Sequence, residues 1–398
     1  MYSPTLDQLI EEEFIKISYV SLHRFSTMSE EALAHFGKLT VTGVWVPGNL
    51  LKTVLSIVDF PSAKKAIARD LIKNSLRKGI HSSLLLDLVI LQRERVNTFR
   101  GRLGFSVLAT FFKTKLFWMC RKNDLLIIPS DMWDFVPLKR RKKVILEVRW
   151  LTQDLIDSLA IPKMIYHSHE SISTSGIPVM PAEVFREFLG FLTYSGIAKD
   201  SIILSGAEPE KILVVPLLRR DTLAISNETV DSRSQRLLYV GRSAPDKRLD
   251  LAVEIASRLR LPLDVVGKYD ASAVEWLDEQ PGVCYMGALT NNALLSLMRT
   301  NLALLAPGVE SWGLAVVEAL QSGMSVFASR FTGVTEWIDH PNLHIISEMN
   351  SDLFVEEFKI YKTTSETCKI FKDINFESKW RKFLSNRGIY NSQFNPYC

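Results

Sequence analysis

The sequence is poor in the features that mark metal-binding, redox and membrane-spanning proteins. Its four cysteines, at positions 120, 284, 368 and 398, share no two-residue spacing and no grouping with histidine, which argues against zinc and redox motifs and suits a reducing compartment. The longest run without a charged residue, 280–298, contains Pro281, Gly282, Asn291 and Asn292, so it does not resemble a bilayer helix. The N-terminus, with glutamates at 11–13, lacks a secretory pattern. We therefore expect a cytoplasmic protein.

Composition indicates an ordinary folded chain. Charged residues make up 23% and hydrophobic residues 47% of the sequence, values that exclude disordered, collagen-like and coiled-coil proteins. A length of 398 residues suggests two or three domains.

The net charge of +4 is unevenly distributed along the chain. Residues 1–217 hold 28 basic and 22 acidic residues, whereas 218–398 hold 20 and 22. Within the first half, 93–122 contains eight basic residues and one acidic residue, interleaved with six aromatic side chains. This asymmetry predicts that the first half faces an anionic membrane surface or an anionic glycan. We expect a buried helix with cationic ends over 104–119, and a solvated loop over the basic run Lys139–Lys143.

The second half alternates short apolar runs with amphipathic segments, the pattern of a parallel sheet flanked by helices. The periodicity predicts strands over 236–240, 263–266, 282–286, 302–306 and 325–328, and helices over 249–259, 291–298 and 314–321. This half is therefore a doubly wound α/β domain.

The first half has the same character but a weaker pattern. It predicts strands over 14–22, 39–46, 84–91, 124–128, 144–148, 164–167, 188–194 and 212–217. The polar stretch after Leu217 has the composition of a linker. We expect an N-terminal domain over 1–218, a linker over 219–235, a second domain over 236–346 and a helical tail over 347–398.

Two motifs of the second half carry recognisable chemistry. Gly241 and Arg242 follow a predicted strand, and Lys247 stands five residues after Arg242; the glycine allows a sharp turn, and the two cations suit phosphate oxygens. The run after Pro307 places Glu310 in a loop and Glu318 about one turn inside a helix, whose free N–H groups suit a phosphate or a sugar oxygen. At the carboxyl ends of parallel strands, both motifs should line one crevice.

In order, these motifs resemble the donor domain of the retaining family-4 glycosyltransferases, the glycosyl transferases group 1. The matching pieces are Leu-Tyr-Val-Gly-Arg with a following Lys, then Asp-Val-Val-Gly, Val-Cys-Tyr-Met-Gly-Ala-Leu, two glutamates separated by seven residues, and Ser-Arg-Phe-Thr-Gly-Val-Thr-Glu. They run from about Arg236 to Ile338, with a weaker echo over 191–215. The resemblance implies a GT-B fold, in which two Rossmann-like, doubly wound domains face each other across a cleft, here with a C-terminal helical tail.

The resemblance also implies roles for individual residues. Arg242 and Lys247 would contact the donor diphosphate, Glu318 the ribose, and Glu310 the donor sugar. The base would pack near residues 285–289. The implied donor-binding set is Gly241, Arg242, Lys247, Met286, Glu310, Ser311, Trp312, Gly313, Leu314 and Glu318.

The implied catalytic set is Glu310, Arg242, Lys247 and one histidine of the first half. His167 ends the strand predicted over 164–167 and His169 follows it; we favour His169, because His167 would alternate into the core. The cations and the helix start could stabilise a leaving diphosphate without a metal ion or cofactor, and no Asp-X-Asp triplet occurs.

The leading hypothesis is a retaining, metal-independent hexosyltransferase of polysaccharide or glycoconjugate biosynthesis. It would move a sugar from a nucleotide-diphosphate-sugar donor to a glycan or lipid-linked acceptor, without nucleic-acid partners and with peripheral contact at the inner face of an anionic membrane. The glycine-rich loop typical of the family's first domain is absent from 22–30. This motivates a second hypothesis, a catalytically silent GT-B subunit that binds a partner. A nucleotide-sugar epimerase is a third.

Overall fold

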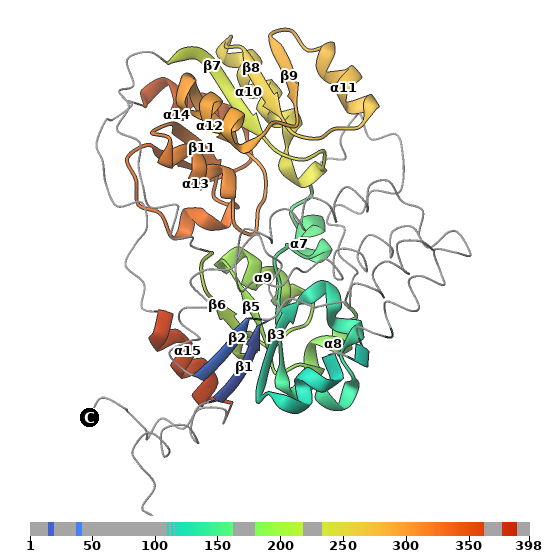
Figure 1. Cartoon of the computed structure of the whole chain (residues 1–398). Helices are drawn as coiled ribbons and strands as arrows, with labels where there is room; N and C mark the ends of the chain where they lie inside the picture. The colour runs from blue at the N-terminus through green and yellow to red at the C-terminus, as the bar shows by residue number, and fades with distance from the viewer. Residues whose placement is uncertain are drawn as a thin grey trace, which may run out of the picture.

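The computed structural model describes residues 15–19, 37–41, 110, 113–114, 116–161, 180–217, 233–361 and 376–387. These residues contain two parallel β-sheets, each covered by helices and each belonging to one half of the chain (Figure 1). The expected pair of α/β units is thereby confirmed.

The first sheet contains six described strands, and every described pair is parallel. Their spatial order is β2 (Gly37–Val41), β1 (Ile15–Tyr19), β3 (Leu125–Pro129), β4 (Val144–Glu147), β5 (Gly190–Thr193) and β6 (Ile212–Val214). Strands β3 and β4 are buried throughout and apolar except for Glu147 at the end of β4, as expected for strands with helices on both faces. The helices of this half include α7 (Gln153–Ser158), α8 (Ala182–Glu187) and α9 (Gly196–Leu204).

The second sheet is also parallel, and the order in which its strands are added reverses at its centre. Its spatial order is β12 (Leu343–Ile346), β11 (Ser325–Ser329), β10 (Asn301–Ala306), β7 (Ser234–Val240), β8 (Leu263–Val266) and β9 (Val283–Gly287). The chain runs from β7 outward to β9, and then from β10 outward to β12. The pair β7 and β10 is therefore the topological switch point, outside which ligands bind in doubly wound folds.

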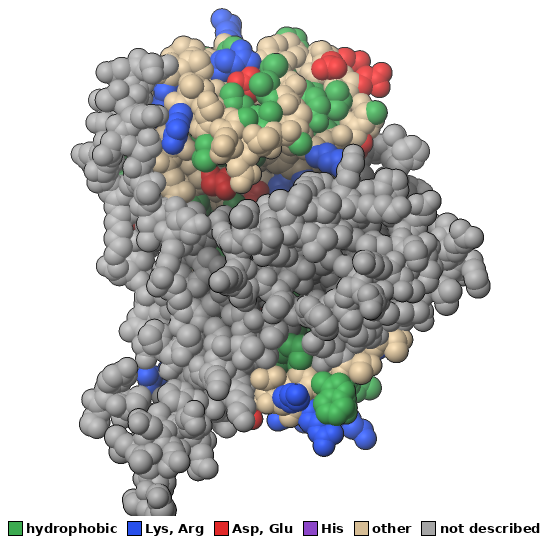
Figure 2. Space-filling model, viewed as in Figure 1, with side chains coloured by type: hydrophobic (Ala, Val, Ile, Leu, Met, Phe, Trp, Pro, Cys, Tyr) green, Lys and Arg blue, Asp and Glu red, His purple; other side chains and the backbone are tan. Residues whose placement is uncertain are grey.

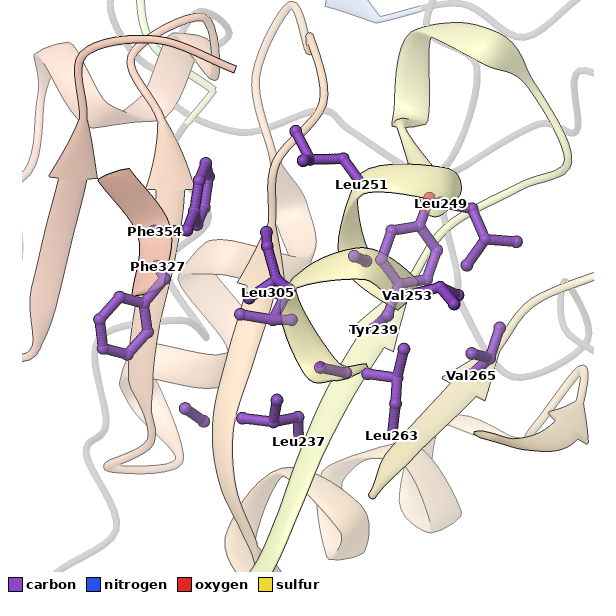
Figure 3. Close-up of a cluster of buried hydrophobic side chains, with 14 of the residues drawn as sticks. Leu237, Tyr239, Leu249, Leu251, Val253, Leu263, Val265, Leu305, Phe327 and Phe354 are labelled. Carbon is purple, nitrogen blue, oxygen red and sulfur yellow. The ribbon is translucent and has the colours of Figure 1, made fainter. Parts of the chain in front are cut away.

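Alternate residues of these strands enter opposite cores. Leu237 and Tyr239 of β7 lie in one buried cluster with Leu305 and Phe327 (Figure 3), whereas Leu238 lies in the cluster on the other face. The first cluster is covered by α10 (Leu249–Leu259) and α14 (Ser351–Ile360), and the second by α12 (Asn291–Thr300) and α13 (Leu314–Gln321). A further helix, α11 (Ala271–Asp278), precedes β9. Apolar residues on both faces explain the continuous hydrophobic runs in the sequence.

The tail returns to the first half of the molecule. Helix α15 (Phe376–Ser385) places Trp380, Phe383 and Leu384 in a buried cluster with Leu125 and Ile145 of the first sheet. The last described helix follows the second domain in sequence but packs against the first domain.

Agreement with the predicted elements is closest in the second half. Helices α10 and α13 and strand β8 have the predicted bounds, and the other predicted strands differ from the observed ones by one or two residues at their ends. Helix α11 and strand β12 were not predicted. In the first half, the strand predicted over 39–46 lies at 37–41, while the strands predicted over 84–91 and 164–167 fall outside the described residues.

Two expectations about the basic regions are wrong. The run Lys139–Lys143 is not a loop but part of a 3₁₀ helix (Leu138–Lys143), in which Arg141 is buried and paired with Glu187. Within the described part of the segment 104–119, Leu116 and Met119 are buried, whereas Phe117 and Trp118 are exposed. The described residues of that segment therefore have apolar side chains both against the core and in solvent. No helix among the described residues has the length and apolarity that crossing a bilayer requires.

Candidate functional site

The two predicted motifs meet at the carboxyl ends of β7 and β10. These strands are direct neighbours, with Leu304 opposite Leu238. The loop after β10 passes close to the 3₁₀ turn η6 (Pro245–Lys247), where the Val309 N–H donates to the Asp246 carbonyl at 2.7 Å. A Cβ on Gly308 would lie 2.5 Å from that carbonyl oxygen, so only glycine permits this approach.

Four charged side chains form a continuous cluster at this meeting point. Arg242 donates to Asp246 at 3.0 Å, and the Lys247 ammonium lies 3.4 Å from Asp246 and 3.2 Å from Glu310. Lys247 also donates to the Val309 carbonyl at 3.2 Å. The structure thus brings together three of the predicted site residues, Arg242, Lys247 and Glu310, and adds Asp246.

The start of α13 lies beside this cluster. Its N-cap, Gly313, has a φ of +104° and offers no side chain to the first turn, so no side chain caps the helix start there. A Cβ on Gly313 would lie 2.6 Å from Thr332, which is a second reason for glycine. The loop that carries Glu310 is also held by the segment after β11, because Glu310 forms a β-bridge with Thr332. Lys247, Glu310 and Gly313 line a small pocket that also borders residues of α13.

The charge cluster also faces the first domain. A second pocket is lined on one side by Trp150, Leu151 and Ile156, and on the other by the cluster residues together with Val309 and Ser311. The site therefore lies in a groove between the two sheets, as the expected cleft requires.

Hydrogen bonds hold the loop after β10 against the first domain. The Ser311 hydroxyl donates to the Arg149 carbonyl at 2.5 Å, and the Ser195 hydroxyl donates to the Ser311 carbonyl at 2.7 Å. The Trp312 side chain is buried and meets the Tyr194 ring edge-on, with centroids 6.4 Å apart. The Trp312 side chain is thus part of the interdomain core.

Tyr194 is held as a neutral hydrogen-bond donor. Burial and the neighbouring Glu147 carboxylate raise the pKa of its phenol well above the ordinary value, and its hydroxyl donates to Glu147 at 2.5 Å. Glu147 is in turn paired with Arg149. This buried set fixes the strand end from which the Arg149 carbonyl reaches Ser311.

Glu336 of the second domain reaches the N-terminus of α9 in the first. Its carboxylate accepts from the Gly196 N–H at 2.6 Å and from the Ile197 N–H at 3.1 Å. The next residue, Trp337, donates from its indole to the Tyr194 carbonyl at 3.0 Å. A carboxylate at a helix start satisfies free N–H groups and the positive end of the helix dipole. Glu336 therefore joins the two domains beside the groove.

The remaining predicted residues lie around this centre or outside the described chain. Gly241 directly follows β7, Leu314 opens α13, and Glu318 is half-buried on the same helix. Met286, near the end of β9, is 38% exposed. His167 and His169 lie outside the described residues. Sequence reasoning missed Asp246 and Glu336, although both stand inside the quoted motifs.

Comparison with known proteins identifies the second half. Residues 223–376 match the family model described as glycosyl transferases group 1. Residues 223–376 are a glycosyl transferases group 1 domain. No curated protein matches the sequence.

Solved structures resemble the chain at low sequence identity. HepE of Anabaena, solved with UDP-glucose, is 14% identical and has a TM-score of 0.51, over 87% of this chain and 89% of that one. A glycosyltransferase from Rickettsia africae is 11% identical with a TM-score of 0.45, over 87% of each chain. The likeness to HepE extends beyond the group 1 domain, and the GT-B fold expected from the sequence is confirmed.

The contact between Glu336 and α9 gives a prediction about stability. Glu336→Ala removes the acceptor of two N–H groups at a helix start, so we expect it to lower the free energy of unfolding by about 0.5–2 kcal/mol in urea titrations. Glu356→Ala, an exposed glutamate of α14, is the matched control and should change it by less than about 0.5 kcal/mol. Equal stability of the two variants would show that the contact contributes nothing.

Proposed function

We propose that this chain is a glycosyltransferase that moves a sugar from a nucleotide-diphosphate-sugar donor to a glycan or lipid-linked acceptor. The observation that carries the proposal is the cluster of Arg242, Lys247 and Glu310 beside the uncapped start of α13, within a glycosyl transferases group 1 domain. Two cations and a helix N-terminus at a switch point suit a diphosphate, and a carboxylate beside them suits sugar hydroxyls.

Each predicted residue has a role in this proposal. Arg242 and Lys247 bind the diphosphate after the turn at Gly241, and the backbone of 311–314 meets the distal phosphate and the sugar. Glu310 accepts hydrogen bonds from the sugar, Glu318 from the ribose, and Met286 lies against the base. His169 remains the predicted catalytic histidine of the first domain.

Charge development explains how such a site accelerates transfer. Breaking the sugar–phosphate bond leaves negative charge on the nucleotide diphosphate while positive character grows on the sugar. Fixed cations and helix N–H groups stabilise that charge more in the transition state than in the donor. We propose that they do so without a metal ion, and that the acceptor hydroxyl attacks on the face that the diphosphate leaves, which retains the anomeric configuration.

Steady-state kinetics tests these assignments. We expect Arg242→Ala, Lys247→Ala and Glu310→Ala each to lower kcat/KM by about 10²- to 10³-fold, because each removes a group that acts on developing charge. The exposed Lys359 of α14 supplies the control, Lys359→Ala, which should retain wild-type turnover. UDP-glucose, the donor bound by HepE, is the first substrate to assay.

The products of the same assay decide between reaction classes. Transfer with retention gives an α-linked product from an α-linked donor, and a chelator leaves the rate unchanged. Epimerised nucleotide sugar formed without an acceptor would instead indicate an epimerase. Unchanged turnover in both Arg242→Ala and Glu310→Ala would refute the site assignment.

A surface of the first domain supports the proposed membrane contact. Trp118 is 50% exposed and Leu138 67% exposed, and the Arg140 guanidinium lies 5.7 Å from the centre of the Phe117 ring. The same two segments, 113–122 and 138–143, carry exposed cations at Lys113, Arg121, Lys122, Lys139, Lys142 and Lys143. Figure 2 shows basic residues around an apolar projection at the end of this domain away from the group 1 domain. Exposed aromatics ringed by cations suit an anionic lipid surface.

Vesicle co-sedimentation tests this contact. The chain should bind phosphatidylglycerol vesicles better than phosphatidylcholine vesicles, with binding that falls as salt rises. Removing two cations, in Lys139→Ala/Lys142→Ala, should lower the partition coefficient about 30-fold, at about 1 kcal/mol per cation. Lys359→Ala should bind like wild type. Binding that is independent of anionic lipid would exclude the membrane contact.

A further inference from the structure

Asp246 is the least accessible member of the charge cluster and touches both of its cations. Its side chain is 7% exposed, against 39% for Arg242 and 15% for Lys247. The Arg242 Nη2 lies 3.0 Å and 3.2 Å from its two oxygens, and the Lys247 Nζ lies 3.4 Å from one of them. One buried carboxylate is thus shared by the two cations proposed for the diphosphate.

The backbone around Asp246 fixes this carboxylate in place. Its carbonyl accepts the Val309 N–H at 2.7 Å, and the turn η6 is closed by the Lys247 N–H, which donates to the Ala244 carbonyl at 3.0 Å. Pro245 precedes it, which restricts the turn further. Asp246 therefore has a fixed position between β7 and the loop after β10.

A fixed carboxylate limits the rotamer freedom of the long cationic side chains that pair with it. Arginine and lysine lose considerable rotamer freedom when a ligand orders them. Because Asp246 already holds Arg242 and Lys247, that ordering takes place on folding rather than on binding. Preorganised charge of this kind contributes most when charge develops on a bound diphosphate.

The same carboxylate opposes the binding of an anion. Arg242 and Lys247 carry two positive charges, and Asp246 and Glu310 carry two negative charges, so the cluster is neutral. A buried negative charge beside a diphosphate weakens its binding in the ground state. A group present only to attract phosphate would not be a carboxylate.

We propose that Asp246 is a positioning residue, which holds Arg242 and Lys247 in the geometry that serves the transition state and accepts weaker diphosphate binding in exchange. The inference rests on the proposed function and deepens it at the same site. It assigns to Asp246 a role through the two cations, without contact with the donor.

The test compares affinity with turnover in Asp246→Asn, which keeps the size of the side chain and removes its charge. Inorganic pyrophosphate is the calorimetric probe, because it presents the diphosphate without a base or sugar. We expect the Kd for pyrophosphate to fall about threefold to tenfold, because one opposing charge is gone. In the same variant we expect kcat to fall at least tenfold, because the cations lose their shared anchor.

A matched control separates this effect from a general loss of an ion pair. Asp250 pairs with Arg248 at 3.0 Å in the same domain, and neither residue lines the two pockets. Asp250→Asn should leave both the pyrophosphate Kd and kcat unchanged. A purely structural role for Asp246 would weaken pyrophosphate binding together with turnover, and that result overturns the proposal, as does a kcat within twofold of wild type.

The calorimetric measurement of pyrophosphate binding does not depend on glycosyl transfer. If the wild type binds pyrophosphate but turns over no nucleotide sugar, the proposed function fails, and the role of Asp246 is decided by a double-mutant cycle with Arg242→Ala. The gain in affinity from Asp246→Asn should differ when Arg242 is absent, because the two charges are coupled. An equal gain in both backgrounds would show that Asp246 does not act through Arg242.

Discussion

The parallel pairing of β7 with β10 is the constraint on which the rest of the site depends. These strands are more than 60 residues apart in sequence, yet their register places the turn after one against the loop after the other. Because both strands are buried on two faces, a shift of one residue would exchange the two cores, and the register is strongly specified. The ion pair between Lys247 and Glu310 therefore depends on the packing of these two buried strands.

A second set of contacts connects this site to the first domain. Ser311 forms hydrogen bonds with Arg149 and Ser195, and the Glu336 carboxylate accepts a hydrogen bond at the start of α9. The loop that carries Glu310 is therefore held on one side by its own sheet and on the other by the first domain. This arrangement lets one short segment line both the pocket at α13 and the groove between the domains.

The sequence predicts local structure well where one physical signal dominates. Helices α10 and α13 have the predicted bounds, because apolar periodicity and a following turn mark both ends. Glu336 was missed because its partners, Gly196 and Ile197, are about 140 residues away in sequence. Asp246 was missed because the sequence does not show that the loop after β10 buries its carboxylate. Arg141 illustrates the reverse case: its neighbours are solvated cations, but Trp133 and Phe188 lie 5.3 Å and 5.2 Å from its guanidinium, and burial follows from those rings.

The central claim is that the paired ends of β7 and β10 form a diphosphate site, and thermal unfolding in the presence of nucleotides tests it most directly. A ligand that binds only the folded chain stabilises it by about 2.7 kcal/mol at a concentration of 100 Kd. The account predicts that at least one common nucleoside diphosphate raises Tm clearly more than its monophosphate does, and that Lys247→Ala abolishes the difference. Equal shifts from the monophosphate and the diphosphate, or no shift from any nucleoside diphosphate, would contradict it.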